Sequence, residues 1–423
     1  MKTKGIYVLA AGLLVMTGMA TSCSQDGPDN PDGKPAPRKE INLTEKTRAA
    51  ADGLVDFYSR FTIDMAECAS RAGIGDNKNV VISPLSAAMV FSMAANASDE
   101  NAMKEYCKYL GVDDIESLNE LSKVLLEKLP VADNTSSFSL ENSIWVNSGY
   151  NLKLTNEFSD IVTSKYLAST KHVDFSNTEA TLKALNDWCA SNTDNKITGH
   201  FKDVNPSTYA ILLNSMYFKG KWSDDIFDSS RTKAAVFHGL DGDSSPLTME
   251  SDFTEGLYAS DSAYECFTLS FGNKAFRLEI ILPAENVTAE NEGDRLTAER
   301  IANLRKMYAK ASVKAFLPKF SAENSHNLNN MLSAMNLGGL TLPDLTMFTK
   351  PVTGGIQYNQ SVYFTLNETG AEAATITSGN MDPIAPGPME VQEITVKVDR
   401  PFYFFIREFS TDVCIMSGRI CNL

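Results

Sequence analysis

The spacing of apolar residues predicts mostly helices in the first half of the chain and mostly strands in the second. After Thr44, apolar residues recur at steps of three and four through Leu54, Phe61 and Cys68, which is the period of an amphipathic helix. Ser83-Pro84 predicts the start of another helix, because proline is favoured in a first helical turn. Further helices are predicted over residues 156–166 and 182–191.

Short apolar runs bounded by turn residues predict the strands. These runs cover residues 80–82, 139–146, 209–218, 276–282, 313–317, 362–366, 394–398, 402–406 and 413–420. Helices followed by strands are typical of an α+β fold, here with large and mostly antiparallel sheets. No internal repeat of solenoid or propeller length occurs. No second tether interrupts residues 45–423, so we expect them to form one large domain.

The first residues have the composition of an export signal. Lys2 and Lys4 precede an uncharged, mostly apolar run from Gly5 to Ala20, which is short for a bilayer span and typical of a signal-peptide core. The small residues before Cys23 resemble a bacterial lipobox, although Ala20 stands where leucine is usual. This predicts a lipoprotein signal peptide over residues 1–22 and acylation of Cys23, whose two or three chains would anchor the protein stably. The alternative is an ordinary signal peptide with an incidental cysteine.

Residues 23–44 are predicted to be a disordered tether that follows the lipidated cysteine. Residues 24–40 hold four Pro and two Gly and show no apolar periodicity. The protein is therefore expected to be a cell-envelope lipoprotein of the outer membrane, with exposure on the outer surface as a further expectation. The membrane would be contacted through the lipid anchor alone.

Composition excludes several classes of protein. The 43% hydrophobic and 22% charged residues are those of a globular chain, which excludes disorder of the whole molecule. The net charge of -15 disfavours binding of nucleic acid. The four histidines are scattered at positions 172, 200, 238 and 326, so no local metal site or other cofactor site is predicted.

The spacing of the cysteines after the tether matches no metal-binding or redox motif. They stand at positions 68, 107, 189, 266, 414 and 421. Most are predicted to be buried free thiols, which behave as small hydrophobes, although an oxidising envelope permits disulfides.

Motifs of catalysis are absent from the sequence. It contains no GxSxG, HExxH or GxGxxG, and the segment from Phe218 to Trp222 lacks the first glycine and the Ser/Thr of a phosphate-binding loop. A catalytic triad assembled in space remains open at this point. We nevertheless predict that the protein is not an enzyme.

The most informative segment lies near the C-terminus. If residues 371–379 form a strand, one face carries only small side chains, namely Ala371, Ala373, Thr375, Thr377 and Gly379. Such a strand could enter between two existing strands without displacing a packed core. Gly370 would be its hinge, since glycine adopts backbone angles that other residues avoid. The alternative is a flexible loop without a role.

These residues resemble the hinge of the serpin family. Residues 368–374 match the inhibitory pattern EEGTEAA, and further family motifs follow one another along the chain from about residue 45 to the end. They are residues 79–86 against NxxxSPxS, 185–197 against INxWV…NTxGKI, 213–222 against NAxYFKGxW, 317–320 and the pair 400–402 with 418–419. The resemblance implies three sheets, eight or nine helices and an exposed reactive loop at about 368–395.

The resemblance also implies a function as a suicide inhibitor of serine endopeptidases, with cysteine endopeptidases as a second class. The protease attacks the loop and forms an acyl-enzyme, and the freed loop then inserts into the main sheet. The hinge residues implied are Glu368, Gly370, Ala371, Glu372, Ala373, Ala374, Thr375 and Thr377. Ala371 replaces the usual Thr, and Ile376 falls on the outward face. A monomer is expected.

The same resemblance implies a region that opens to admit the strand. Ser83, Ser86 and Asn214 would lie there, with Trp222 near the end where insertion starts. Gln360 occupies the position of a histidine that is usual in the family, so the hydrogen-bond network of this region must differ.

The attacked bond follows from the usual distance to the hinge. The scissile carbonyl usually lies sixteen residues after the hinge glutamate, which gives Ile384 followed by Ala385. An aliphatic residue there would suit an elastase-like or subtilisin-like protease. The segment is longer than usual, so Met381 and Met389 are alternatives.

Two other functions remain open at this point. A non-inhibitory carrier or chaperone of the same fold would place a charged or bulky residue on the inward face of the hinge. A surface glycan-binding lipoprotein would expose aromatic platforms.

Overall fold

The computed structural model describes residues 37–72, 75, 77–285, 287, 295–371 and 391–423. Within these residues the chain forms eight α-helices. They are α1 (Glu45–Cys68), α2 (Pro84–Ala97), α3 (Glu100–Leu110), α4 (Ile115–Lys128), α5 (Asn156–Lys165), α6 (Thr178–Asn192), α7 (Ala298–Lys306) and α8 (Leu328–Ala334). Short 3-10 turns are η1 (Leu129–Val131), η2 (Ser148–Tyr150), η3 (Ser229–Arg231) and η5 (Gly338–Thr341).

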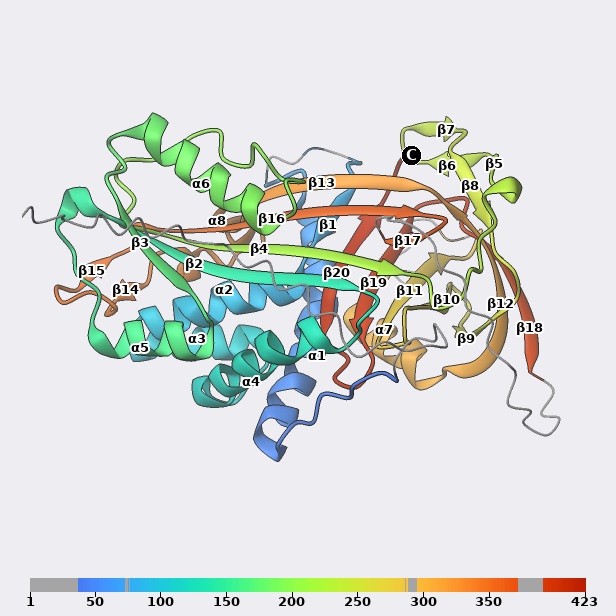
Figure 1. The fold of residues 1–423 in the computed structure, drawn as a ribbon, viewed down its shortest axis with the longest axis horizontal. Coiled ribbons are helices and arrows are strands. Elements are labelled where there is room, and N and C mark those ends of the chain that lie inside the picture. Colours follow the sequence, from blue (N-terminus) through green and yellow to red (C-terminus); the bar gives the residue numbers. More distant parts are fainter. Residues whose placement is uncertain (1–36, 73–74, 76, 286, 288–294, 372–390) are drawn as a thin grey trace, which may run out of the picture.

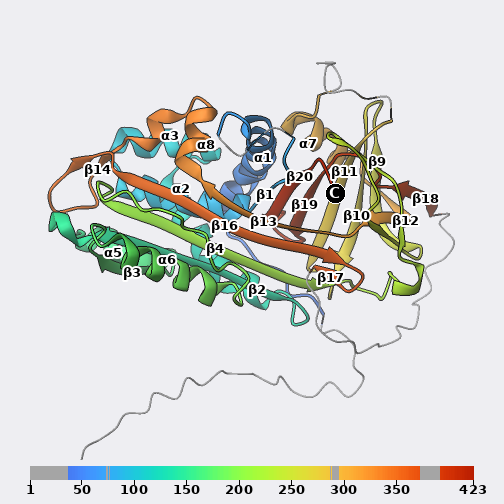
Figure 2. The same cartoon turned by 90° about the horizontal axis from the view of Figure 1, so that it is seen from above.

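A six-stranded sheet runs along the long axis of the molecule (Figure 1). Its order is β13–β16–β17–β4–β2–β3, in which β16 and β4 run parallel and β17 is antiparallel to both. Figure 2 shows β16 and β4 side by side over most of their length. The strands are β2 (Ser137–Asn147), β3 (Ser169–Val173), β4 (Ala210–Lys221), β13 (Phe320–Asn327), β16 (Ile356–Asn367) and β17 (Gly370–Ala371).

A ten-stranded sheet contains most of the remaining strands. Its order is β1–β20–β19–β11–β10–β9–β12–β8–β5, with β18 also paired to β12. The strands are β1 (Val80–Ile82), β5 (Lys233–Ala234), β8 (Leu247–Glu250), β9 (Thr254–Ser260), β10 (Tyr264–Phe271), β11 (Phe276–Pro283), β12 (Ala309–Pro318), β18 (Gln392–Lys397), β19 (Phe402–Glu408) and β20 (Cys414–Ile420). Two small hairpins are β6 (Phe237–Gly239) with β7 (Gly242–Ser244), and β14 (Asp344–Leu345) with β15 (Val352–Thr353).

The predicted α+β class and the sheet architecture are confirmed. Strand β9 pairs with β10 on one side and with β12 on the other, so the ten-stranded sheet has two arms joined at β9. With the six-stranded sheet, these arms make up the three sheets that were expected. Each of the nine strands predicted from apolar runs is present, and several are longer than those runs. Strand β16, for example, begins at Ile356, before the predicted start at residue 362.

Two hydrophobic cores lie on opposite faces of the six-stranded sheet. Leu212 and Met216 of β4 face the larger core, which α1 and α2 share with the ten-stranded sheet. Ile211 and Leu213 face a smaller core under α6, which contains Trp188. Because both faces are covered, β4 is buried along most of its length and does not alternate between buried and exposed residues.

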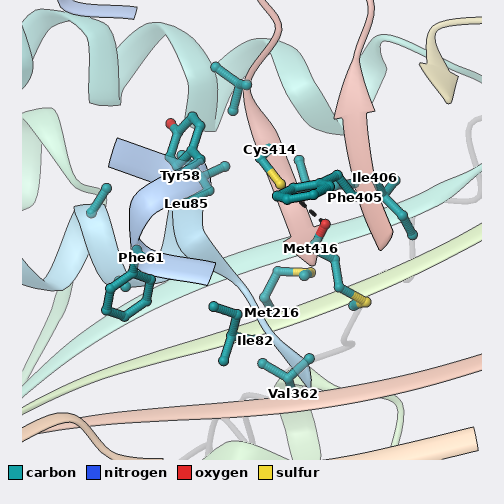
Figure 3. Packing of buried hydrophobic residues seen from close by; sticks show 14 of the residues in the cluster. Tyr58, Phe61, Ile82, Leu85, Met216, Val362, Phe405, Ile406, Cys414 and Met416 are labelled. Atoms are coloured by element: carbon teal, nitrogen blue, oxygen red, sulfur yellow. Dashed lines mark hydrogen bonds between the residues drawn. The ribbon is translucent and has the colours of Figure 1, made fainter. Parts of the chain in front are cut away.

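The larger core fills the space where helices and both large sheets meet (Figure 3). Its members there come from seven elements: Tyr58 and Phe61 of α1, Ile82 of β1, Leu85 of α2, Met216 of β4, Val362 of β16, Phe405 of β19 and Met416 of β20. The six described cysteines are buried free thiols, as predicted.

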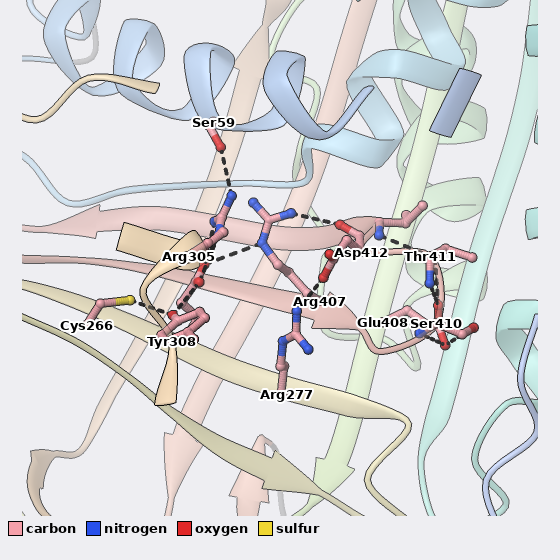
Figure 4. A network of polar contacts seen from close by, with 12 residues as sticks. Ser59, Cys266, Arg277, Arg305, Tyr308, Arg407, Glu408, Ser410, Thr411 and Asp412 are labelled. Carbon is pink, nitrogen blue, oxygen red and sulfur yellow. Dashed lines mark hydrogen bonds and ion pairs between the residues drawn. The ribbon is translucent and has the colours of Figure 1, made fainter. Parts of the chain in front are cut away.

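A buried ion network holds the ten-stranded sheet to α7 and α1 (Figure 4). The Glu279 carboxylate is fully buried and accepts hydrogen bonds from Arg305 Nη2 at 2.5 Å and from Tyr308 Oη at 2.6 Å. Arg407, also fully buried, lies 3.4 Å from it, and Arg305 Nη1 donates to Ser59 Oγ of α1 at 3.2 Å. Burial alone would raise the pKa of Glu279, but the two guanidinium groups and their hydrogen bonds lower it overall.

We predict that Glu279→Gln destabilises the protein strongly, because it leaves two guanidinium groups buried without a countercharge. The expected loss is about 3–5 kcal/mol, measured as a lower midpoint of urea unfolding. Glu255→Gln is the matched control, because its pair with Lys274 is exposed and should contribute less than about 1 kcal/mol. Equal midpoints for the two variants would contradict the role given to the network.

Candidate functional site

The boundary between β16 and β4, called the seam below, is paired over only part of its length. Residues 356–362 of β16 pair in parallel with residues 210–216 of β4, and the last pair is Val362 with Met216. At the far end, β17 lies between the two strands. Leu366 pairs with Ala371 on one side, and Ala371 pairs with Gly220 on the other. The sequence predicted a strand beginning at Ala371, and the structure places this residue in the mouth of the seam.

Gly370 has a conformation that requires glycine. Its φ is +130°, and a Cβ added there would lie 2.1 Å from the carbonyl oxygen of Gly220. Ala371 is fully buried as part of the larger core. The chain therefore turns at Gly370, where the hinge was predicted, and directs its next side chain into the protein.

Glu368 fixes the approach to this turn. Its carboxylate accepts hydrogen bonds from Thr232 Oγ1 at 2.8 Å and from Lys319 Nζ at 3.0 Å. Burial by itself would raise the pKa of Glu368, but the hydrogen bond and charge of Lys319 lower it below its usual value. The charged form is therefore the one that holds the turn in place.

Trp222 closes the mouth of the seam from the side of β4. Its ring is buried and stacks on Phe271 with the centroids 4.7 Å apart, and its Nε1 donates to the carbonyl oxygen of Asn367 at 3.0 Å. Trp222 N also donates to the Thr369 carbonyl oxygen at 3.3 Å. Trp222 therefore contacts the residues on either side of Glu368, namely Asn367 and Thr369.

Gln360 binds the backbone of Ser83 at the middle of the seam. Both residues are fully buried, and Gln360 Nε2 donates to the Ser83 carbonyl oxygen at 2.6 Å while Ser83 N donates to Gln360 Oε1 at 3.0 Å. Ser83 also caps α2, since its Oγ accepts from Ser86 N at 3.1 Å. The amide at position 360 thus ties β16 to β1 and α2.

Two side chains of β13 bind β1 in the same way. Asn324 Oδ1 accepts from Val81 N at 2.6 Å, and His326 Nε2 donates to the Val81 carbonyl oxygen at 3.0 Å. Burial lowers the pKa of His326, so the neutral ring occupies this position. Together with Gln360, these side chains satisfy the backbone groups along the outer edge of β1.

Asn214 lies across the seam from Gln360, but its side chain donates its hydrogen bond to β2, on the side away from the seam. The two residues are direct neighbours in the parallel register. Asn214 Nδ2 donates to Asn142 Oδ1 of β2 at 2.8 Å, and Asn142 Nδ2 donates to the Tyr166 carbonyl oxygen at 2.9 Å. Asn214 Oδ1 is buried without a hydrogen-bond partner, and so is Ser86 Oγ.

The outer face of the seam is covered by α6 and the loop after it. Cys189 Sγ lies 3.9 Å from Ser361 Oγ of β16, and Lys196 lies over the ring of Tyr363 at 5.7 Å. Asn186 holds this loop by accepting from Phe201 N at 2.8 Å. A strand entering the seam would therefore pass under α6.

The structure brings the described members of the predicted site to two places along the seam. Glu368, Gly370, Ala371 and Trp222 lie at its mouth, and Ser83, Ser86, Asn214 and Gln360 lie at its middle. Outside the described residues lie Cys23, Glu372, Ala373, Ala374, Thr375, Thr377, Met381, Ile384, Ala385 and Met389.

Two residues of the site were not predicted from the sequence. Lys319 belongs to a motif that was noticed, in residues 317–320, but its pairing with Glu368 requires the fold. Asn142 lies in a predicted strand with no motif to mark it, and only the register of β2 with β4 brings it to Asn214.

The described residues suit a strand-accepting site. Among them, no group of three or more His, Cys, Asp or Glu side chains could hold a metal ion. No helix of this part of the chain is long and apolar enough to cross a membrane. Beyond Val362 and Met216, strands β16 and β4 no longer pair with each other. An extended segment could pair with both of these strand edges.

Comparison with known proteins finds one family along the chain. Residues 57–423 match the family model described as "Serpin (serine protease inhibitor)". Human neuroserpin is 24% identical over 88% of this chain and 91% of its own length. An uncharacterised serpin-like protein of Thermococcus kodakarensis is 28% identical, over 87% of this chain and 85% of its own.

Solved structures agree with this match. The thermophilic serpin tengpin in its native state superposes with a TM-score of 0.73 at 26% identity, covering 92% of this chain and 97% of tengpin. Human thyroxine-binding globulin in complex with its ligand reaches a TM-score of 0.75 at 19% identity, covering 88% and 99%, and this likeness concerns the fold alone.

We predict that Gly370→Ala withdraws β17 from the seam, because the added methyl group would collide with the Gly220 carbonyl oxygen and the backbone angle would be strained. Hydrogen–deuterium exchange of the amides at 220–221 and 370–371 should accelerate at least about tenfold, as expected when paired strand ends open locally. Gly339→Ala is the control, since a Cβ there meets nothing within 4 Å. Unchanged exchange in Gly370→Ala would show that the turn tolerates a side chain.

Proposed function

Since this chain belongs to the serpin family, we propose that it is an inhibitor of serine endopeptidases that traps its target by inserting its cleaved reactive loop into the seam. The observation that carries the proposal is β17. The first residues of the loop already form a strand between β16 and β4 and are antiparallel to both. The next residues could extend this strand if the seam opened further.

The register of β17 specifies where later residues would lie. Continued in steps of two from Ala371, it brings Ala373 between Phe364 and Phe218, both of which are buried in the larger core. A small side chain fits between two rings, whereas a long or charged one does not. The small-faced pattern of the hinge therefore agrees with the surroundings that insertion would provide.

In the proposed reaction, the serine Oγ of the protease attacks the carbonyl carbon of Ile384. The bond to the nitrogen of Ala385 breaks, the new amine leaves with a proton, and an ester joins the two proteins. Insertion then carries the ester along the sheet before water attacks it. Fifteen residues at about 3.3 Å each would move the protease by roughly 50 Å.

This mechanism requires an intact form that is less stable than the inserted one and is held by a kinetic barrier. Two features of the seam support such a form. The paired part ends at Val362 and Met216, and buried Asn214 Oδ1 and Ser86 Oγ have no partners. Each unpaired buried group costs about 1–3 kcal/mol.

The alternative proposal is a non-inhibitory carrier or chaperone. It would not need a hinge with small residues on the inward face, which this chain has at Ala371 and Ala373. A surface glycan-binding protein is disfavoured by the tryptophans, because Trp145, Trp188 and Trp222 are all buried and offer no platform.

We further propose that the target is elastase-like or subtilisin-like, that a cysteine endopeptidase is a second possible class of target, and that the inhibitor acts as a monomer. The aliphatic Ile384 supports the specificity. The apolar run before Cys23 and the Pro-rich residues after it support a lipid-anchored protein of the cell envelope, held at the outer membrane by its acyl chains.

Replacing Ala373 with arginine tests the insertion mechanism. Ala373→Arg should place a charge between Phe364 and Phe218, so the loop would be cleaved without trapping the protease. In SDS gels, the yield of covalent complex with an elastase-like or subtilisin-like protease should fall at least about tenfold, which corresponds to slowing insertion by about 1.4 kcal/mol or more.

The matched control is Glu372→Arg, whose side chain would point to the other face, beside the partly exposed Thr365 and Lys219. It should retain the complex. An undiminished complex with Ala373→Arg would refute insertion, and cleavage of the unmodified protein without any complex across a protease panel would favour the non-inhibitory alternative.

Mass spectrometry of the peptide released during inhibition tests the position of the attacked bond. The C-terminal peptide should begin at Ala385. A peptide that begins at Asp382 or Glu390 would identify Met381 or Met389 as the reactive residue instead. A peptide that begins after Lys or Arg would also refute the proposed class of protease.

Lipidation is tested by Cys23→Ala, which should remain unprocessed or be released as soluble protein. Fractionation and mass spectrometry of the N-terminus would measure this, with Ser24→Ala as a control that keeps the cysteine. Recovery of processed Cys23→Ala in the membrane fraction would contradict the anchor.

A further inference from the structure

The segment before α1, residues 37–44, packs along the body of the protein and is called the strap below. Ile41 is buried in the larger core, and its N donates at 2.9 Å to Ser410 Oγ, in the turn between β19 and β20. The guanidinium carbon of Arg38 lies 3.5 Å from the centre of the Phe409 ring in the same turn. Figure 1 shows the strap in blue where it passes this turn. The strap therefore has a defined place on the ten-stranded sheet.

The turn that receives the strap is itself held firmly. The buried Glu408 carboxylate accepts hydrogen bonds from Ser410 N at 2.9 Å and from Ser410 Oγ at 2.8 Å (Figure 4). Arg48 Nη1 of α1 donates to the Ser410 carbonyl oxygen at 3.1 Å. Phe409 N donates to the Ala275 carbonyl oxygen at 2.8 Å. A group bound to this turn is thus bound to the ten-stranded sheet and to α1.

A second contact of the strap lies close to the mouth of the seam. Lys39 N donates at 3.3 Å to the carbonyl oxygen of Ala132, in the short link between η1 and β2. The same oxygen accepts from Asn273 Nδ2 at 3.2 Å. Next to Asn273, Gly272 N donates at 2.7 Å to the carbonyl oxygen of Lys221, the residue of β4 that pairs with β17. The strap and the mouth therefore lie at the same end of the molecule.

The two contacts of the strap belong to opposite sides of the seam. Ala132 leads into β2, which pairs with β4 over ten residues. On the other side, Gln360 holds β16 to Ser83 beside β1, and β1 continues through β20 to β19. The turn with Phe409 and Ser410 joins these last two strands. Widening of the seam at its mouth would therefore pull on the strap from both ends.

We propose that the strap is a brace that restrains opening of the seam at its mouth, and that the stacked pair of Arg38 and Phe409 is its side-chain fastening. This inference rests on the proposed function, because a restraint on opening acts on the step that admits a strand. The ring of Phe409 is 41% exposed, so the pair lies at the surface and its loss leaves Ile41 in the core. Removing the pair should therefore loosen the strap without unfolding the domain.

Arg38→Ala tests the brace by hydrogen–deuterium exchange. The amides at 220–221 and 370–371 should exchange about two- to fivefold faster, which is the effect expected from the loss of one exposed cation–π contact on a local opening. Amides 280–282, in the middle of the ten-stranded sheet, should exchange at an unchanged rate. Phe409→Ala should have the same effect, and Arg38→Ala should add nothing to it, because both variants remove one contact.

Lys314→Ala is the matched control. It removes another surface cation, which lies 6.0 Å from the centre of the exposed Phe253 ring and does not touch the strap. Its exchange at the mouth should equal that of the wild type.

A second measurement follows the intact protein during incubation without protease. Arg38→Ala should lose its capacity to trap protease about two- to fivefold faster than the wild type, because the same opening would admit the uncleaved loop. Lys314→Ala should lose it at the wild-type rate.

The outcomes separate the brace from the proposed function. Unchanged exchange at the mouth in both Arg38→Ala and Phe409→Ala would refute the brace, even if the wild type traps proteases. Equal acceleration at amides 280–282 would also refute it, since the pair would then stabilise the whole domain. If the mouth alone exchanges faster but the wild type traps no protease, the proposed function fails and the brace stands as a restraint on the sheet.

Discussion

The parallel pairing of β16 with β4 is the constraint on which the rest of the molecule depends. The two strands share seven register pairs, from Ile356 with Ala210 to Val362 with Met216. Parallel pairs are slightly less stable per residue than antiparallel ones. A strand that enters antiparallel to both replaces one parallel boundary by two antiparallel boundaries, as β17 already does over Gly370 and Ala371. Under the proposed mechanism, the sheet would therefore gain hydrogen bonds by admitting one more strand.

The arrangement of side chains around this boundary makes such a change local. Gln360 holds β16 to Ser83, and Asn214 holds β4 to Asn142, so each strand is fastened to its own half of the molecule. In both halves the fastening is a buried amide: Gln360 uses both its donor and its acceptor, whereas Asn214 uses its donor alone. Separation of the halves would break backbone pairs of the sheet and leave these amide contacts intact.

Much of the fold could be predicted from the sequence because its signals are local. The strand at Val80–Ile82 follows from an apolar run, and the helix that starts at Pro84 follows from a proline in its first turn. The helix α3 was not predicted, since only Tyr106, Cys107 and Leu110 are buried in it and its apolar period is short. The proposed hinge was predicted from its alternation of small residues, and most of it lies outside the described part of the chain. The pairing of Lys319 with Glu368, and of Asn142 with Asn214, depends on strand register, which a single sequence does not encode in any short segment.

The way in which β1 is covered has a consequence for the solubility of the protein. β1 is the last strand of the ten-stranded sheet, and a bare edge of this kind is a template for edge-to-edge association between molecules. Here Asn324, His326 and Gln360 occupy the hydrogen-bonding groups of Val81 and Ser83 with side chains. Side chains cannot propagate a ladder, so the sheet ends at β1 and no intermolecular strand can be added there while β13 and β16 stay in place. Aggregation through this edge would thus require these two strands to detach first.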